Sequence, residues 1–217
     1  MFINPHTIAF LDSPDLFCYT VTTDRSVGHQ MTRDDILDAA AQIIREKGYH
    51  ATSMQDIAEA VDLRKASLYH HFDGKQKILV ELLDMALDIL IQELEGVVKT
   101  QIPPDEKLRL AMRSYLNSLA KYNDLASVLL LEHRSLEHKL RKKHIARRDR
   151  YEKLWRGIIE DGTTNGIFIC DDPGLATKIV LGIANWTIMW YRQSGQFSAD
   201  DIADQSADLI LHGLCVR

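Results

Sequence analysis

Apolar residues recur at helical spacing along almost the whole chain from Thr32 onward. Residues three and four apart share one face of a helix, so each recurrence predicts an amphipathic helix. Thr32 precedes the first recurrence as a candidate N-cap, and Gly48 follows it as a stop signal. The apolar residues between these limits are Ile36, Ala40, Ile43 and Ile44. The pattern therefore predicts a first helix that ends just before Gly48.

A second helix signal begins at "TSMQDIAEAV". Thr52 or Ser53 can cap this helix, and Gln55 or Asp56 can return a side-chain hydrogen bond to the cap. The following apolar residues keep helical spacing, so a short helix is expected at about 53–60.

Longer amphipathic segments fill the rest of the chain. Asp73-Gly74 interrupts the pattern, after which one long helix runs to about Val98 and Pro103-Pro104 starts the next. Gly162 and Gly166 are expected to end a later helix. The remaining helical segments are expected at about 105–122, 124–134, 137–162, 173–194 and 199–212. No alternating strand pattern is longer than "IFIC", so the predicted fold is all-α.

The stretch "LRKASLYHHFDGKQ" follows a turn at Asp62-Leu63 and predicts a short helix at about 65–71. With the helix before it, this segment forms a helix-turn-helix pattern, whose second helix enters the major groove of DNA. Such a helix needs small residues near the bases, and cations or hydrogen-bond donors near phosphates and base edges. The stretch supplies these groups at Arg64, Lys65, Ala66, Ser67, Tyr69, His70 and His71. Lys75 begins the next helix, where it can meet a phosphate together with backbone amides.

The segment from Thr32 to about Leu83 resembles the DNA-binding half of the TetR family of transcriptional regulators. The resemblance rests on "DIAEAV" and on the Leu-Tyr-x-His-Phe-x-x-Lys pattern from residue 68 to residue 75. It implies a repressor in which Leu68 and Phe72 belong to the core of the small domain. It also implies that the residues near DNA are Ser53, Lys65, Ser67, Tyr69, His71 and Lys75. Asp62-Leu63-Arg64 stands where the family often has Gly-Val-Ser, so we expect a slightly strained turn and an altered operator preference.

The amino-acid composition indicates the class of protein to which the chain belongs. The chain has 217 residues, 46% apolar and 26% charged, which is typical of a globular protein. Its net charge of −5 argues against indiscriminate binding to nucleic acids. Residues 31–77 hold seven Lys and Arg against eight Asp and Glu, so a positive face there has to come from placement. Three domains are expected: a flexible arm at 1–30, the helix-turn-helix domain at 31–77, and a helical ligand-binding and dimerisation domain at 78–217.

The sequence offers no sign of a membrane segment or a cofactor. No apolar run reaches the roughly 18 residues that a membrane span requires. Cys18, Cys170 and Cys215 match no metal or redox spacing, so free thiols in a reducing cytoplasm are expected. His133, His138 and His144 are spaced by five and six residues, which does not bring imidazoles to one helix face as a metal ligand set. With no Gly-rich phosphate loop or Gly-x-Ser-x-Gly motif either, we predict that the protein is not an enzyme.

Two wide apolar faces near the C-terminus predict an interface between two copies of the chain. The first is formed by Leu175, Ile179, Ile183, Trp186 and Trp190, and the second by Ile202, Leu209 and Ile210. Helix pairs of this kind form four-helix interfaces in homodimers, although part of either face can equally be intrachain core. A two-fold dimer would read a pseudo-palindromic operator. A purely structural helical dimer, without specific DNA binding, is the rival interpretation.

A cationic segment and an aromatic segment are candidates for a ligand site. Residues 134–156 hold ten Lys and Arg against three Asp and Glu, which suits either a solvated helix face or attraction of an anionic ligand. The stretch "GIANWTIMWYRQSG" combines an amide, two indoles and a cation, and paired indoles can line a pocket. The candidate ligand-binding residues are Arg147, Arg148, Tyr151, Asn185, Trp186, Trp190 and Arg192.

The C-terminal half also resembles a narrower group. "RRDRYEKLWRGIIEDGTTNGIF" and the segment after it are similar to TetR-like repressors that control fatty-acid and other acyl-CoA catabolism. This resemblance implies an acyl-CoA inducer, with its acyl part in a helical cavity and its phosphates near cationic side chains at the mouth. The alternatives are an inducer that is an uncharged aromatic or lipid-like compound, or a DNA-binding protein with no small-molecule sensor.

Overall fold

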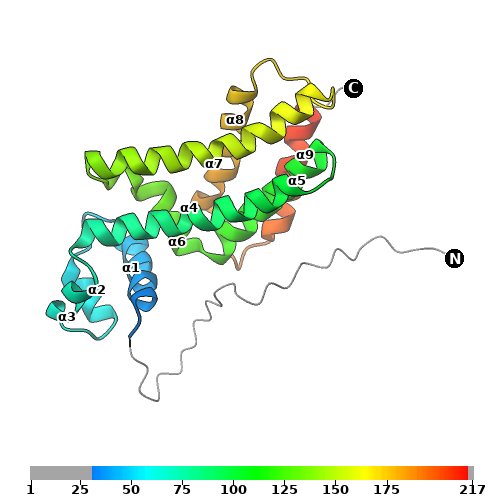
Figure 1. Cartoon of the computed structure of the whole chain (residues 1–217). Coiled ribbons are helices and arrows are strands. Elements are labelled where there is room, and N and C mark those ends of the chain that lie inside the picture. Colours follow the sequence, from blue (N-terminus) through cyan, green and yellow to red (C-terminus); the bar gives the residue numbers. More distant parts are fainter. Residues whose placement is uncertain (1–30, 215–217) are drawn as a thin grey trace. The chain divides into compact units, whose positions relative to one another are not determined.

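The structure, a computed structural model, describes residues 31–214, so the expected arm at 1–30 and two of the three cysteines lie outside the described residues. Figure 1 shows a chain of helices in this part. In chain order these are α1 (Arg33–Lys47), α2 (Met54–Ala60), α3 (Lys65–His71), α4 (Lys75–Lys99), α5 (Pro104–Lys121), α6 (Asn123–Ser127), the π-helix η1 (Val128–Glu132), the 3-10 helix η2 (His133–Ser135), α7 (His138–Thr164), α8 (Pro173–Trp190) and α9 (Ala199–Leu214). No strand occurs in residues 31–214, which confirms the all-α prediction.

The first two helices begin at capping boxes that fix their N-termini. Thr32 accepts a hydrogen bond from the backbone of Asp35, whose carboxylate accepts one from the backbone of Thr32 in return. Ser53 and Asp56 form the same reciprocal pair at the start of α2. Of the alternatives open in the sequence, Ser53 is therefore the cap and Asp56 its partner. Each pair satisfies backbone donors that a helix start otherwise leaves unpaired.

Three later boundaries differ from the prediction. The block expected at 124–134 divides into α6, η1 and η2, and α8 ends at Trp190 instead of about residue 194. Gly162 does not end a helix, because α7 continues to Thr164. A Cβ atom on Gly162 would lie 2.2 Å from Cδ2 of the Phe168 ring, so this glycine serves close packing.

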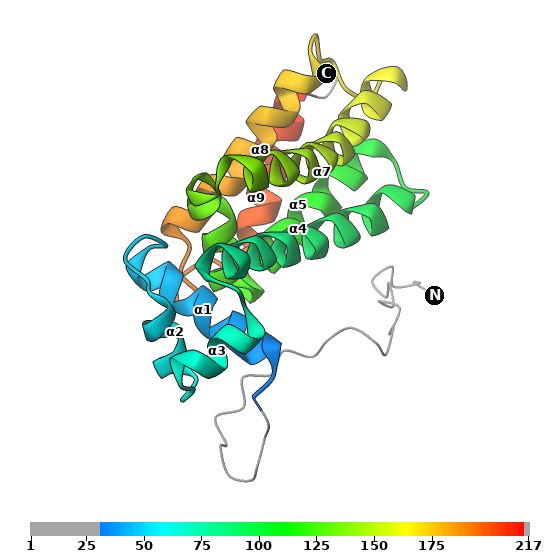
Figure 2. The ribbon, with the colours of Figure 1, turned by 60° about the vertical axis from the view of Figure 1, so that its left-hand side comes forward.

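One cluster of buried side chains and several ion pairs hold the described part together. Ile36, Ile57, Leu68 and Phe72 are at most 1% exposed and form the core of the three small helices α1–α3. As Figures 1 and 2 show, α4 leaves this group and runs beside α7. Salt bridges from Arg109 to Asp208 (2.7 Å) and from Arg113 to Asp204 (2.5 Å) hold α5 against α9. Within residues 31–214, no helix is long and apolar enough to cross a membrane.

Candidate nucleic-acid interface and ligand cavity

The turn between α2 and α3 sets the direction of α3. Asp62 has a φ of 54°, and the amide of Leu63 donates to the carbonyl of Ala58 at 2.8 Å. The left-handed region costs a non-glycine residue about 1–2 kcal/mol, although Asp tolerates it better than most. The slight strain expected where this chain lacks the family's glycine is thus located at Asp62.

Helix α3 buries one side and exposes the other. Leu68 is fully buried and Phe72 is 1% exposed, in agreement with the core role expected for both. The opposite side carries side chains named in the sequence as DNA contacts. Arg64, Lys65, Tyr69 and His70 are exposed, whereas Ser67 and His71 are half-buried. The structure thus brings six of the eight candidate residues to one short helix and its cap, and their contact with DNA stays a prediction.

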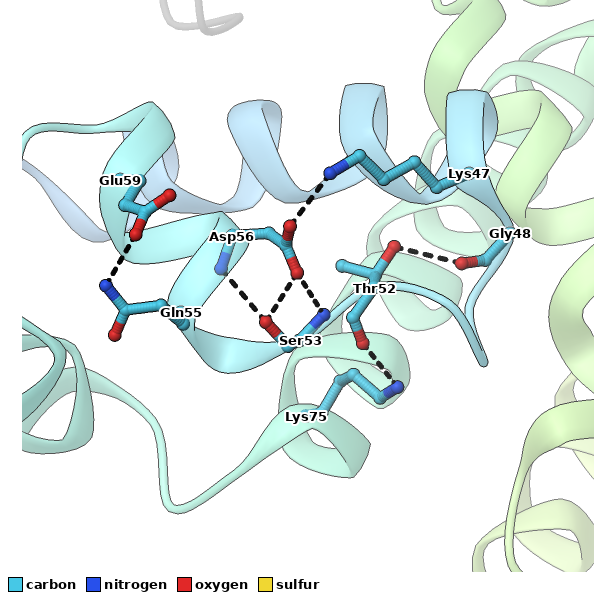
Figure 3. A network of polar contacts seen from close by, with 8 residues as sticks. All are labelled: Lys47, Gly48, Thr52, Ser53, Gln55, Asp56, Glu59 and Lys75. Atoms are coloured by element: carbon cyan, nitrogen blue, oxygen red, sulfur yellow. Dashed lines mark hydrogen bonds and ion pairs between the residues drawn. The ribbon is translucent and has the colours of Figure 1, made fainter.

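Ser53 and Lys75, the other two candidates, are engaged within the protein (Figure 3). The hydroxyl of Ser53 donates to the carboxylate of Asp56, which also pairs with Lys47 at 2.8 Å. The hydrogen bond from Lys47 is the main cause that holds the pKa of Asp56 well below its usual range. A negative charge beside the candidate interface is therefore compensated by a neighbouring cation.

Lys75 ties the start of α4 to the loop between α1 and α2. Its ammonium donates to the carbonyls of Tyr49 and Thr52, each at 2.6 Å, and lies 4.2 Å from the centre of the Tyr49 ring. Partial burial lowers the pKa of Lys75. The contact of Lys75 with a phosphate stays a prediction, and the structure adds a role in fixing this loop.

Arg33 fastens the end of α3, a contact that sequence reasoning missed. Its guanidinium donates to the carbonyl of His71 and forms two hydrogen bonds with Glu81, at 2.6 and 3.0 Å. It also lies 4.0 Å from the centre of the Phe72 ring. The C-terminus of α3 is therefore held to both α1 and α4.

Gln76 and Arg45 make further polar contacts between the small helices and the rest of the described chain. The amide nitrogen of Gln76 donates to the hydroxyl of Tyr49 at 2.9 Å and to the carbonyl of Ser135 at 2.8 Å. Arg45 on α1 forms an ion pair with Asp124 on α6 at 2.5 Å. Because α6 also lines the cavity described next, the ion pair of Arg45 links that cavity to α1, while Gln76 binds η2, which directly follows the cavity-lining η1.

A cavity of about 20 Å³, partly open to solvent, lies between α4, α5, α6 and η1. Its wall is mostly apolar and is formed by Ala86, Ile89, Leu90, Tyr115, Ser118, Leu119, Tyr122, Leu125, Ala126, Leu129 and Leu130. Leu129 and Leu130 belong to the π-helix, a conformation that is frequent at functional sites. The volume is well below the range typical of small-molecule sites, roughly 300–1,000 Å³, so a ligand of that size requires the surrounding helices to move apart.

Two polar pairs lie at the wall of the cavity. The hydroxyl of Tyr115 donates to the side-chain oxygen of Asn185 at 2.6 Å. The hydroxyl of Ser118 donates to the carboxylate of Glu93, which also accepts a hydrogen bond from Ser114 at 3.1 Å. Burial raises the pKa values of Tyr115 and Tyr151. The structure thus connects the candidate Asn185 to the cavity through Tyr115.

The other candidate ligand residues lie elsewhere. Arg147 forms ion pairs with Asp84 and Asp88 on α4, and Arg148 is exposed on α7. Trp186 and Trp190 are 65% and 48% exposed on α8, and neither lines the cavity. The exposed side chain of Arg192 donates to the carbonyl of Tyr191. Their contact with a ligand stays a prediction.

Sequence reasoning missed Glu93, Tyr115 and Ser118. A usable signal was present, because Tyr115 and Ser118 place two hydroxyls three residues apart on the apolar face of α5. Glu93 interrupts the apolar face of α4 in the same way, between the buried Leu90 and Leu94.

The histidines expected not to bind a metal form a different arrangement. The rings of His133 and His144 stack with their centres 6.1 Å apart. Burial, together with the smaller contributions of His133, Arg148 and Arg147, lowers the pKa of His144 to about 4. In the part of the chain that the structure describes, no group of three or more His, Cys, Asp or Glu is placed to hold a metal ion.

Comparison with known proteins gives two family matches. Residues 36–82 match the family of bacterial regulatory proteins called tetR, and residues 101–214 match the tetracyclin repressor-like C-terminal domain. The HTH-type transcriptional repressor KstR2 of Rhodococcus jostii (strain RHA1) is 28% identical over 193 residues, which cover 88% of this chain and 95% of that repressor.

Two solved structures are similar over nearly their whole length. The transcriptional regulator PfmR from Thermus thermophilus is 39% identical with a TM-score of 0.77, over 82% of this chain and 97% of that one. AibR, crystallised with isovaleryl coenzyme A and operator DNA, is 28% identical with a TM-score of 0.76, over 82% of this chain and 96% of that one.

Proposed function

The chain belongs to the TetR family of bacterial regulatory proteins, and from this we propose that it is a ligand-responsive repressor that binds a pseudo-palindromic operator as a homodimer. The family and the relatives found are transcriptional regulators and not enzymes. The observation that carries the proposal is the exposed face of α3, which presents cations, a phenol and an imidazole on a helix fixed at both ends.

The homodimer is supported by the exposed face of α8. Five apolar residues spaced three or four apart are 40–65% exposed in the single chain: Leu175, Ile179, Ile183, Trp186 and Trp190. Leu209 on α9 is 77% exposed. Continuous apolar surface of this kind marks protein–protein interfaces, and the alternative of an intrachain core does not explain its exposure. We assign this face, the α8 stripe, to the contact between two copies of the chain.

An acyl-CoA thioester is the inducer that fits best. The mostly apolar cavity suits an acyl group, and exposed cations of α7, including Lys142, Lys143 and Arg148, suit the phosphates of CoA. AibR, a relative of similar fold, was crystallised with isovaleryl coenzyme A. An uncharged aromatic or lipid-like compound is the second candidate, because the lining of the cavity by itself suits it equally.

Release from DNA then follows as a shift of population. A ligand can only favour release if it binds better to the conformer whose two α3 helices are wrongly spaced. The long helix α4 joins the cavity to the DNA-binding helices. Contacts of α6 and η2 with Arg45 and Gln76 provide a second connection between the same two regions.

Selection of bound fragments from random double-stranded DNA tests the DNA-binding part of the proposal. The wild-type protein is expected to enrich fragments that contain two related half-sites in inverted order. The double variant Lys65→Ala with Tyr69→Ala is expected to enrich none. Enrichment without any sequence pattern by the wild type would contradict the proposal.

A further inference from the structure

Charged groups lie behind two parts of the cavity wall: Glu93 lies behind Ser118, and the Lys121 ammonium lies 4.8 Å from the centre of the Tyr122 ring. Glu93 lies on α4, and its carboxylate accepts hydrogen bonds from Ser114 and from Ser118, a residue that lines the cavity. None of the described residues that line the cavity is Lys, Arg or His. A carboxylate that entered the cavity beside Ser118 would therefore be repelled by Glu93, because the wall itself supplies no Lys, Arg or His side chain there.

Of the three lining residues that carry a hydroxyl, Tyr115, Ser118 and Tyr122, the first two already donate their protons within the protein. Ser118 donates its proton to Glu93, and Tyr115 donates its proton to Asn185. A bound carboxylate needs hydrogen-bond donors in place of water, because burying it unpaired is costly. These two hydroxyls offer it oxygen acceptors instead.

We propose that the cavity takes the uncharged hydrocarbon end of an acyl group, and that Glu93, acting through Ser118, is a specificity-determining residue that rejects acyl groups ending in a carboxylate. This inference rests on the proposed acyl-CoA response. It adds a rule on chemistry, since the regulator would respond to thioesters of monocarboxylic acids and ignore those of dicarboxylic acids. Discrimination of this kind comes from an element that repels the wrong ligand.

Two thioesters of nearly equal size provide the test. The acyl group of 4-methylpentanoyl-CoA ends in an isopropyl group, where succinyl-CoA carries a carboxylate of the same shape. Both are titrated into the complex of the full-length wild-type protein with its operator. We expect 4-methylpentanoyl-CoA to release the DNA at a concentration at least about tenfold lower than succinyl-CoA does, since like charges at short range disfavour binding.

Glu93→Gln tests the residue itself, and Glu95→Gln is the matched control. Glu95 lies on the same helix and pairs with Arg150, outside the wall of the cavity. The ratio of the concentrations at which the two thioesters release DNA is expected to fall to about threefold or less in Glu93→Gln. In Glu95→Gln this ratio is expected to stay as in the wild type. If Glu93 had only a structural role, its replacement would weaken the binding of both thioesters alike and leave the ratio of their releasing concentrations unchanged.

The outcomes separate the two proposals. Equal potency of the two thioesters on the wild type overturns the role of Glu93 but leaves the acyl-CoA response standing. A ratio of releasing concentrations that is unchanged in Glu93→Gln also overturns the role of Glu93 and leaves the acyl-CoA response standing. Failure of both thioesters to release DNA overturns the selectivity rule alone if another acyl-CoA of a panel does release it, and overturns the proposed inducer class as well if none does. If Glu93→Gln does not fold, the ratio of the two releasing concentrations is compared between the wild type and Glu93→Ala, and an unchanged ratio overturns the role of Glu93.

Discussion

Gln76 at the start of α4 and Ser135 at the end of η2 are joined directly, since the amide of Gln76 donates to the Ser135 carbonyl at 2.8 Å, and η2 follows the cavity-lining η1. The same amide donates to the hydroxyl of Tyr49, and the Gln76 side-chain oxygen accepts from the backbone of Glu137 at 3.3 Å. One side chain thus touches the loop after α1, the end of η2 and the residue that precedes α7.

Gln76→Ala is therefore expected to weaken the response to inducer more than the binding of DNA. Loss of these contacts lowers the coupling free energy between the two sites, which in allosteric proteins is typically about 1–3 kcal/mol. The measurement is the ratio of the Kd for DNA with and without saturating inducer, and we expect it to fall by at least about threefold. Gln92→Ala, an exposed change on the same helix, is the control. An unaltered ratio in Gln76→Ala would argue against this connection.

Lys65 and Lys75 are expected to differ in what they contribute. Lys65 is exposed at the start of α3, so Lys65→Ala should change base preference and leave the melting temperature unaffected. Lys75 donates hydrogen bonds to the carbonyls of Tyr49 and Thr52. Lys75→Ala should therefore weaken the binding to all DNA sequences alike and lower the melting temperature of the protein. Binding to a panel of operator variants, with melting curves, distinguishes the two. Uniform loss of affinity from both changes would contradict this division.

Gly162 and Gly157 give a matched pair within α7. Gly162→Ala should lower the free energy of unfolding by roughly 1–3 kcal/mol, because the Phe168 ring occupies the space of the new methyl group. Gly157→Ala should raise it by up to about 1 kcal/mol, since nothing lies within 4 Å and alanine favours the helix. Denaturant unfolding of both variants is the measurement. Equal effects from the two would contradict the packing described for Phe168.

The local features of the fold were predictable, and the cavity was not. The caps at Thr32 and Ser53 and the turn before α3 depend on residues within a few positions of one another, so the sequence alone indicates them. The wall of the cavity comes from four segments, and no local pattern shows that Glu93 meets Ser118. Gly162 was misjudged for the same reason, because the ring that requires a glycine there comes from beyond the end of the helix.

The α8 stripe predicts the oligomeric state of two variants. Trp186→Glu places a charge in the proposed interface, which should convert the dimer to a monomer at micromolar concentration and abolish tight operator binding. Leu131→Glu is the control, because Leu131 is 53% exposed and belongs to η1 instead of the stripe. Sedimentation and light scattering report the mass. A dimeric Trp186→Glu would remove the stripe from the interface.

His144 predicts how stability depends on pH. Its pKa is lowered to about 4 in the folded protein, against an ordinary value of 6.5. Between these values the unfolded chain binds more protons, so the free energy of unfolding falls as the pH is lowered from 6.5 towards 4. The charged groups that act on His144 are His133, Arg148 and Arg147. The pKa of His133 is lowered as well, so its protonation also lowers the free energy of unfolding as the pH falls.

His144→Gln should remove most of this dependence. The melting temperature of the wild type is expected to fall by several degrees more than that of the variant between about pH 7.5 and pH 5. Asp38, whose pKa is raised to about 6 by partial burial and neighbouring carboxylates, acts in the opposite direction but equally in both proteins. Parallel curves for the two proteins would show that His144 is protonated as easily in the folded state as in the unfolded chain.

The central claim is that a small molecule bound among the C-terminal helices releases the protein from its operator. Fluorescence anisotropy of the purified protein on DNA from upstream of its own gene, titrated with a panel of CoA thioesters, tests it most directly. We predict that at least one acyl-CoA lowers the anisotropy to that of free DNA while free CoA does not. Tight DNA binding that no thioester changes would contradict the acyl-CoA response and direct the search to uncharged aromatic or lipid-like compounds.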